Sequence, residues 1–233
     1  MSASQGAYSG LENLEVMKEA RNYNKYLLSQ ITKRTEPGKR ILDFGAGAGT
    51  FAAPLKDLGF NVVCIEPDLA LRTHLHEIGL SAYSSVNDVA DGSIDLIYTL
   101  NVLEHIQDDR AAAQALIKKL RCGGGLLVYV PAFAILYSSM DRKVGHFRRY
   151  RRAQLMATIS AKNIAINDAQ YVDSLGFWAA LVYRLLDDSS GKINRRAIKV
   201  FDRFIFPLNR LLDPVFGRLF GKNLIVYATK KGD

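Results

Sequence analysis

Apolar residues follow two kinds of spacing along the chain. Near the N-terminus they recur every three or four residues, which predicts an amphipathic helix over 11–33 that ends before Pro37 and Gly38. Farther on, short apolar runs are bounded by turn residues and separated by helical stretches, which is typical of strands. These runs are 40–44, 61–65, 80–83, 94–99, 126–130, 164–172 and 224–229.

This alternation predicts an α/β fold with a doubly wound, mostly parallel seven-stranded sheet covered by helices on both faces. The last two strands could form a terminal antiparallel hairpin, and a long segment rich in aromatic and basic residues separates them. We therefore expect an N-terminal helical lid over 1–36, a core domain over 37–175 and 223–233, and a helical insertion over 176–222.

The composition fits one globular catalytic domain. The chain has 233 residues, of which 48% are hydrophobic, so it can bury one sizeable core. No apolar run approaches the ~18 residues that cross a bilayer, and the first residues do not resemble a signal peptide, so we expect a cytoplasmic location. Cys64 and Cys122 provide no disulfide framework, which suits a reducing compartment, and we expect both to be structural.

Charge is unevenly distributed along the chain. Residues 1–140 carry 13 basic and 15 acidic side chains, whereas residues 141–233 carry 18 and 8, so the net charges are −2 and +10. A basic C-terminal part attracts anionic groups such as substrate phosphates, a membrane surface or nucleic acid, although such surfaces often serve solubility alone.

A glycine-rich loop follows the first predicted strand, in the segment Asp43-Phe-Gly-Ala-Gly-Ala-Gly-Thr50. Glycines let the backbone turn tightly and approach a ligand closely, and the start of the following helix favours a negative group. Glu66 ends the next strand, where a carboxylate can accept hydrogen bonds from both ribose hydroxyls, although it could also be a solvated strand-end acid. The spacing G-x-G-x-G differs from the dinucleotide pattern G-x-G-x-x-G, so no pyrophosphate needs accommodating.

Together with Ser93-Ile-Asp-Leu-Ile-Tyr-Thr, Asn101-Val-Leu-Glu-His-Ile and Leu120-Arg-Cys-Gly-Gly-Gly-Leu-Leu-Val-Tyr-Val-Pro, these motifs resemble class I S-adenosylmethionine-dependent methyltransferases with a Rossmann-like fold. The resemblance implies S-adenosylmethionine as cofactor and S-adenosylhomocysteine as product. It places the methionine end on the glycine loop, the ribose on the acid after the second strand, and adenine on the loop after the third, where serines replace the Asp of many relatives. The cofactor residues so implied are Tyr23, Asp43, Gly45, Ala46, Gly47, Gly49, Glu66, Pro67, Ser85, Val86 and Asn101.

The methyl acceptor is expected beyond the carboxyl ends of the fourth and fifth strands, near 101–105 and 131–150. Methyl transfer from a sulfonium is an in-line displacement, so alignment supplies much of the catalysis, and a hydroxyl acceptor also needs a base. His146 and His105 are the candidate bases, with Tyr150 as a further catalytic candidate, although His105 could instead cap or pack. The histidines are scattered and cysteines do not cluster, so we expect no metal site.

The basic stretch 141–152 follows this region. Arg148 and Arg149, with Tyr137, could bind a phosphate or carboxylate of the acceptor, because guanidinium groups make bidentate contacts. The alternative is that Phe147 and Tyr150 pack while the arginines are solvated. Cations at a helix start oppose its dipole, which favours a compensating anion.

The motifs Gly145-His-x-Arg-Arg-Tyr, Arg21-Asn-Tyr-Asn and Asp213-Pro-Val-Phe-Gly resemble a narrower group, the prokaryotic methyltransferases associated with glycosyltransferases of surface-polysaccharide pathways. This resemblance implies O-methylation of a sugar or lipid-linked, anionic small molecule. Open alternatives are a hydrophobic quinone-like acceptor, a cofactor-binding module without catalysis and, more weakly, RNA methylation.

The insertion carries apolar residues every three or four positions with arginines between them. Its segment 195–220 could contact a membrane surface peripherally, at the inner membrane, or form a lid or a dimer contact, so the chain could be a monomer or a homodimer. We do not expect nucleic acid as a partner, because the apolar fraction is high and no known nucleic-acid module is present.

Overall fold

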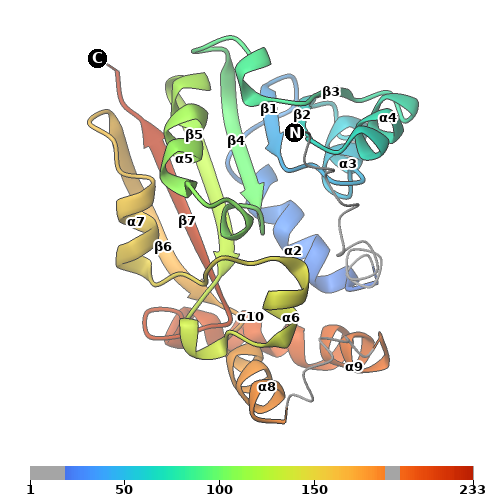
Figure 1. The fold of residues 1–233 in the computed structure, drawn as a ribbon, viewed down its shortest axis with the longest axis vertical. Coiled ribbons are helices and arrows are strands. Elements are labelled where there is room, and N and C mark those ends of the chain that lie inside the picture. The colour runs from blue at the N-terminus through green and yellow to red at the C-terminus, as the bar shows by residue number, and fades with distance from the viewer. Residues whose placement is uncertain (1–18, 187–194, 233) are drawn as a thin grey trace, which may run out of the picture.

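The computed structural model describes residues 19–186 and 195–232 and contains one seven-stranded sheet (Figure 1). The strand order is β3-β2-β1-β4-β5-β7-β6. β7 runs antiparallel to both of its neighbours, β5 and β6, and the other neighbouring pairs are parallel. The predicted mostly parallel sheet with a C-terminal antiparallel pair is therefore confirmed. The strands are β1 (Arg40–Phe44), β2 (Asn61–Ile65), β3 (Ser81–Tyr83), β4 (Ile94–Leu100), β5 (Leu120–Pro131), β6 (Ile164–Val172) and β7 (Asn223–Lys230).

Helices cover both faces of the sheet, as the near-continuous apolar strands require. Successive β5 residues alternate between two buried clusters: Val128 packs with α5 and α7, whereas Leu127 and Tyr129 pack with α2, α3, α4 and α10. The helices are α2 (Arg21–Thr32), α3 (Ala52–Asp57), α4 (Leu69–Glu77), α5 (Asp109–Lys119), α6 (Ser139–Val144), α7 (Arg152–Thr158), α8 (Ser174–Leu185), α9 (Arg195–Val200) and α10 (Phe206–Phe216).

Strand β5 is longer than the apolar run 126–130 predicted. It begins at Leu120, which pairs with Ile94, and includes three glycines that the sequence pattern excluded. A Cβ on Gly125 would lie 2.8 Å from the Tyr227 hydroxyl, so only glycine lets β5 approach its neighbours there. Between Leu120 and Gly125 the pairing with β4 is interrupted, and Gly123 has φ +76°, so the strand starts with an irregular segment.

Residues 11–18 of the helix predicted over 11–33 lie outside the described residues, and helix α2 begins at Arg21, after the non-helical Glu19 and Ala20. Its first turn is held by Asp202, in a π-helical turn (Phe201–Ile205) between α9 and α10. The Asp202 carboxylate accepts the backbone N–H groups of Asn22 and Tyr23, both at 2.9 Å. A carboxylate at this position satisfies free N–H groups and complements the helix dipole.

The helices α8, α9 and α10 of the insertion lie beyond the carboxyl ends of the parallel strands (Figure 1). Asp213 of α10 accepts the backbone N–H groups of Asp173 and Ser174, both at 2.9 Å, where β6 turns into α8. In the described residues, no helix has the length and apolar character of a membrane span.

Backbone strain gathers at the same edge of the sheet. In residues 19–186 and 195–232, three non-glycine residues have positive φ: Asn101 (56°) after β4, Phe133 (59°) after β5 and Asp173 (65°) after β6. Such conformations cost free energy and concentrate at functional sites. The carboxyl edge of β4, β5 and β6 is therefore a candidate site on backbone geometry alone.

Candidate functional site

The glycine loop after β1 is tied to the end of β2. Glu66 is buried, and its Oε2 accepts the Gly47 N–H at 2.8 Å while its Oε1 accepts the Asp68 N–H at 3.0 Å. Gly47 has φ +54°, and a Cβ there would meet nothing within 4 Å. The loop thus presents an open backbone face beside a fixed carboxylate, as expected for a site that a ligand approaches closely.

The two other loop glycines are needed for packing. Gly45 has φ +82°, and its Cβ would collide with Val102 at 2.4 Å, so the loops after β1 and β4 are in close contact. Gly49 has φ +76° and faces Leu75 at 3.0 Å. Ala46 is buried, and its N–H donates to the Ile65 carbonyl at 3.1 Å.

Asp43 is the penultimate residue of β1, two residues before Gly45, and is buried. Burial and the nearby negative charge of Glu66 raise the pKa of its carboxyl to about 7. A buried carboxyl with a raised pKa binds a proton more readily than a solvated carboxyl, and a cationic partner would stabilise its charged form. The loop is therefore suited to a ligand that brings a positive group to Asp43.

Tyr23 of α2 reaches the end of β4. Its hydroxyl accepts a long hydrogen bond of 3.4 Å from the Asn101 amide, and its ring meets Phe206 edge to face at 5.6 Å. Burial raises the pKa of the Tyr23 phenol to about 12. The structure therefore brings the N-terminal helix, β4 and the insertion to one point.

The loop after β3 is held by hydrogen bonds among its own residues. Ser85 caps a short 3₁₀ helix (Val86–Asp88): its Oγ accepts the Asn87 N–H at 3.2 Å, and its own N–H donates to Asp88 at 3.3 Å. Pro67 is exposed beside Glu66. Adenine contacts by Ser85, Val86 and Pro67 stay predictions.

Asp141 in α6 is the centre of the basic stretch. It is fully buried, its Oδ1 lies 2.6 Å from His146 Nδ1, and its two oxygens accept bonds from Arg149 Nε and a terminal nitrogen at 2.9 and 3.0 Å. Ser138 adds its backbone N–H at 2.8 Å. These cationic and N–H partners hold the pKa of Asp141 well below its usual range despite burial. Asp141 fixes the orientation of His146, a role that sequence reasoning missed.

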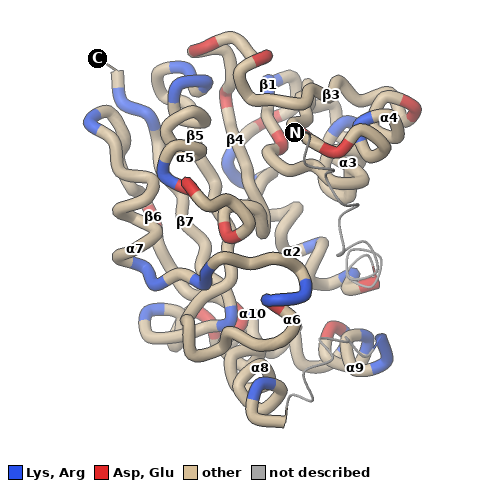
Figure 2. Tube along the Cα trace, viewed as in Figure 1, with Lys and Arg blue, Asp and Glu red and all other residues tan. Residues whose placement is uncertain are grey.

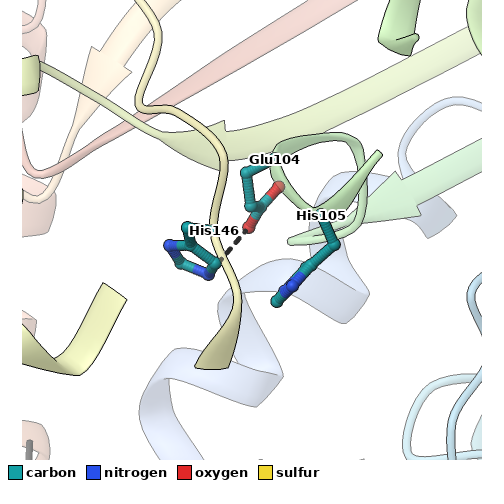
Figure 3. Close-up of side chains that lie close together, drawn as sticks. All are labelled: Glu104, His105 and His146. Carbon is teal, nitrogen blue, oxygen red and sulfur yellow. Dashed lines mark ion pairs between the residues drawn. The ribbon is translucent and has the colours of Figure 1, made fainter. Parts of the chain in front are cut away.

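His146 faces the end of β4 with its other ring nitrogen (Figure 3). Its Nε2 lies 3.8 Å from Glu104 Oε1, and its ring centroid lies 4.6 Å from that of His105. Glu104 is fully buried, neither of its carboxyl oxygens has a hydrogen-bond partner among the described residues, and burial raises its pKa to about 8. Burial and the neighbouring His146 lower the pKa of His105 to about 4. At neutral pH the site therefore holds a protonated carboxyl beside a neutral His105.

Two of the predicted site residues turn inward. Tyr150 is fully buried and donates from its hydroxyl to Asp109 at 2.7 Å, which raises the pKa of the phenol, so it packs in the core and does not face a substrate. Arg149 is buried with its guanidinium on Asp141. The compensating anion that we expected in the acceptor is thus a carboxylate of the protein.

The remaining two predicted substrate residues, Arg148 and Tyr137, also have partners within the protein. Arg148 pairs with Asp109 at 2.8 Å and donates to the Gln107 carbonyl at 2.7 Å. The Tyr137 hydroxyl donates to the His146 carbonyl at 2.6 Å and so steadies the loop that carries the histidine. Their substrate contacts stay predictions.

A family model described as a methyltransferase domain matches residues 17–166, which is more than half of the chain. The chain belongs to this methyltransferase family. The expected class of enzyme, an S-adenosylmethionine-dependent methyltransferase, is confirmed.

A curated relative and two solved structures are similar to this chain, the structures in fold. The methyltransferase is 33% identical over 116 residues to the ubiquinone biosynthesis O-methyltransferase of Xanthomonas axonopodis pv. citri (strain 306), covering 45% of this chain and 48% of that protein. It thus spans about half the length of the curated relatives it matches.

A SAM-dependent methyltransferase of Thermotoga maritima superposes with a TM-score of 0.62 at 18% identity, covering 94% of this chain and 95% of that one. Phosphoethanolamine N-methyltransferase 2 of Haemonchus contortus, solved with phosphomonomethylethanolamine and S-adenosylhomocysteine, gives 0.58 at 17% identity, covering 91% of this chain and 53% of that one. These likenesses confirm the Rossmann-like methyltransferase fold.

Proposed function

We propose that this methyltransferase methylates a hydroxyl group of a small-molecule, sugar or lipid-linked acceptor, with His146 as the general base. The observation that carries the proposal is the buried Asp141–His146 pair at 2.6 Å, whose free ring nitrogen faces the strained end of β4. An aspartate that accepts the Nδ1 proton leaves Nε2 as the acceptor of a second proton, as in other activated hydroxyl sites.

The residues at the ends of β1 and β2 fit the cofactor. When bound, S-adenosylmethionine supplies an electrophilic methyl group carried on a sulfonium. Glu66 has lone pairs beyond its two backbone bonds for ribose hydroxyls, and Gly47 leaves its open face free. Asp43, with a raised pKa, suits a cationic amino group, and Tyr23 with Asn101 closes the site from α2.

His146 moves the proton in this account. Its Nε2 takes the hydroxyl proton of the acceptor, and the Asp141 carboxylate stabilises the resulting imidazolium. Protonated Glu104 offers an O–H donor close to His146 Nε2. Its carboxyl oxygens have no hydrogen-bond partner among the described residues, and a methyl acceptor could supply one. Buried polar atoms without hydrogen-bond partners cost free energy, so they favour binding of a polar ligand that supplies those partners.

The experiment is transfer of a labelled methyl group from S-adenosylmethionine to a panel of acceptors, run on the parent protein, His146→Ala and His76→Ala. His76 lies exposed on α4 and is the matched control. We expect transfer to be lost in His146→Ala alone, with cofactor affinity unchanged.

Full activity of His146→Ala would refute the base assignment. A divalent metal is the rival explanation, because ligand atoms of Glu104, His105 and His146 lie within 4.8 Å of one another. Activity that disappears in EDTA and returns with added metal would contradict a metal-free base. The absence of transfer to every acceptor, with intact cofactor binding, would favour a binding module without catalysis.

A phenolic, quinone-like acceptor is the second candidate. The relatives of known name act in ubiquinone biosynthesis, and aromatic rings gather where β5 and β6 end: Phe133 lies 4.6 Å from Tyr171 and 5.5 Å from Phe177. An apolar aromatic wall suits a ring substrate. A panel that includes a catechol with an isoprenoid tail and a lipid-linked sugar phosphate separates the two candidates by which one becomes labelled.

A further inference from the structure

The outer face of the insertion is apolar. From α9 through the π-helical turn and α10 to the turn that follows, apolar side chains spaced three or four residues apart are more than half exposed. They are Val200 (55%), Phe204 (62%), Leu208 (51%), Leu211 (74%), Val215 (66%) and Leu219 (71%), here called the outer stripe.

The inner face of the same segment carries buried polar groups beside Phe206, which packs in the core. Asn209 is fully buried and accepts the Leu175 N–H at 2.8 Å, while Asp202 and Asp213 accept backbone N–H groups of α2 and α8. Buried polar groups and Phe206 thus attach the insertion to the core, and the outer stripe is left outside. Exposed patches of this size mark a surface that contacts something else.

Helix α8 extends the outer stripe. Trp178, Val182 and Leu185 are more than half exposed at helical spacing. Trp178 meets Phe220 with ring centroids 5.9 Å apart, and Phe220 meets Phe216 at 5.6 Å, so aromatic rings connect α8 to the end of α10. The two helices therefore contribute to one apolar surface.

The exposed charged side chains of 195–218 have one sign, and one of them, Lys199, pairs with Glu19 at 3.2 Å. Every exposed charged side chain in 195–218 is basic, because the acids Asp202 and Asp213 turn inward. Figure 2 shows Lys and Arg on α8, α9 and α10. The exposed basic residues are Arg195, Arg196, Lys199, Arg203, Arg210 and Arg218.

We propose that this surface docks the methyltransferase on an anionic phospholipid membrane, with the outer stripe among the acyl chains and the arginines on the head groups. Apolar side chains edged by cations are the pattern of helices that lie in a membrane interface. The uniform positive charge favours anionic lipid over a second copy of the chain, whose same surface would repel it. The helices of this surface lie beyond the carboxyl ends of the parallel strands (Figure 1).

Binding to vesicles tests this proposal, and its readout does not depend on methyl transfer. The probe is phosphatidylcholine vesicles with and without phosphatidylglycerol, measured by co-sedimentation. Trp178 is the one tryptophan of the chain and lies in the surface, so its emission reports insertion directly. We expect binding and a blue shift with phosphatidylglycerol, both weakened by salt.

Two variants with matched controls locate the contact. Leu211→Ser/Val215→Ser should lose vesicle binding, while Leu58→Ser/Leu69→Ser, equally exposed on the α3–α4 side, should keep it. Arg195→Gln/Arg203→Gln/Arg218→Gln should weaken binding by about 100-fold, because each cation contributes about tenfold or less near an anionic surface. The control for charge is Lys118→Gln/Lys162→Gln/Lys231→Gln at the opposite edge of the sheet, which should keep most of the affinity.

The proposal is overturned if the parent protein binds neither vesicle, or if the control variants lose binding as strongly as the surface variants. Sedimentation equilibrium provides the third arm. A dimer that Leu211→Ser/Val215→Ser dissociates, in a protein without vesicle binding, would assign the surface to a second copy. Each of these failures would leave the proposed O-methyl transfer intact.

Discussion

The two halves of the site are built in different ways. At the ends of β1 and β2, backbone N–H groups of a glycine loop meet one carboxylate, Glu66, from the very next strand. At the ends of β4 and β5, side chains from distant segments meet: Glu104 and His105 follow β4, and His146 follows α6. The donor half is local and made of backbone, whereas the acceptor half is long-range and made of side chains. Mutations should therefore separate binding from chemistry.

The largest expected effect is on the acceptor half. His146→Ala should lower kcat by about 10²- to 10⁴-fold, the usual contribution of a general base, while the Kd for S-adenosylmethionine stays unchanged. Steady-state methyl transfer and calorimetry on the same preparation check this, with His76→Ala as the control. A fall in cofactor affinity that accounts for the whole loss would break the comparison between the halves.

Asp141→Asn tests how the histidine is held. It breaks a buried ion pair with Arg149, so we expect a loss of about 3–5 kcal/mol of stability together with a drop in kcat. Because the pKa of Asp141 is lowered on folding, this contribution exists above the unfolded pKa of about 4 and disappears as pH falls through and below it. Urea unfolding across acid pH should show the gap between parent and variant closing. A constant gap would contradict the charge-based role, and Asp57→Asn provides an exposed control.

Glu66→Ala tests the donor half. Loss of the ribose acceptor and of the bond to Gly47 should weaken S-adenosylmethionine binding by about tenfold or more, since an unmet hydrogen bond to a charged group costs about 1.5–3 kcal/mol. Isothermal titration calorimetry measures this, and the exposed Glu77→Ala is the control. Unchanged affinity would remove the ribose assignment.

The smallest effect concerns Glu104. Its pKa rises on folding to about 8, so its contribution to stability is complete below the unfolded pKa and is lost as pH rises toward 8. Glu104→Gln removes this titration, and its Tm should exceed that of the parent by several degrees near pH 8 and by less near pH 5. Differential scanning fluorimetry with Glu77→Gln as control checks it. An equal gain at both pH values would indicate a packing effect instead.

The sequence predicted what depends on short-range pattern. Apolar runs located all seven strands, and the glycine loop with Glu66 was found because its partners are adjacent elements. The start of β5 was missed, because its pairing with β4 is irregular there: Leu120 pairs with Ile94, the next pair is Gly125 with Leu96, and Gly123 between them has φ +76°. A period of two or 3.6 residues carries no information on such contacts.

The acceptor half was less predictable for the same reason. Asp141, His146 and Arg149 are near in sequence but meet across an irregular loop, so periodicity could not show that the carboxylate neutralises the arginine. Tyr150 was a candidate catalytic phenol from its sequence position, but its hydroxyl donates to Asp109 at the start of α5, a contact that the sequence pattern does not show. Buried pairs between irregular segments follow from tertiary packing alone.

One crossed measurement tests the central claim that donor binding and proton transfer reside in separate halves. Cofactor Kd and single-turnover methyl transfer at saturating cofactor are measured in Glu66→Ala and His146→Ala. The account predicts that Glu66→Ala raises Kd but retains most of the single-turnover rate, whereas His146→Ala retains Kd and loses the rate. Variants that lose affinity and rate together, or a His146→Ala enzyme that turns over like the parent, would contradict it.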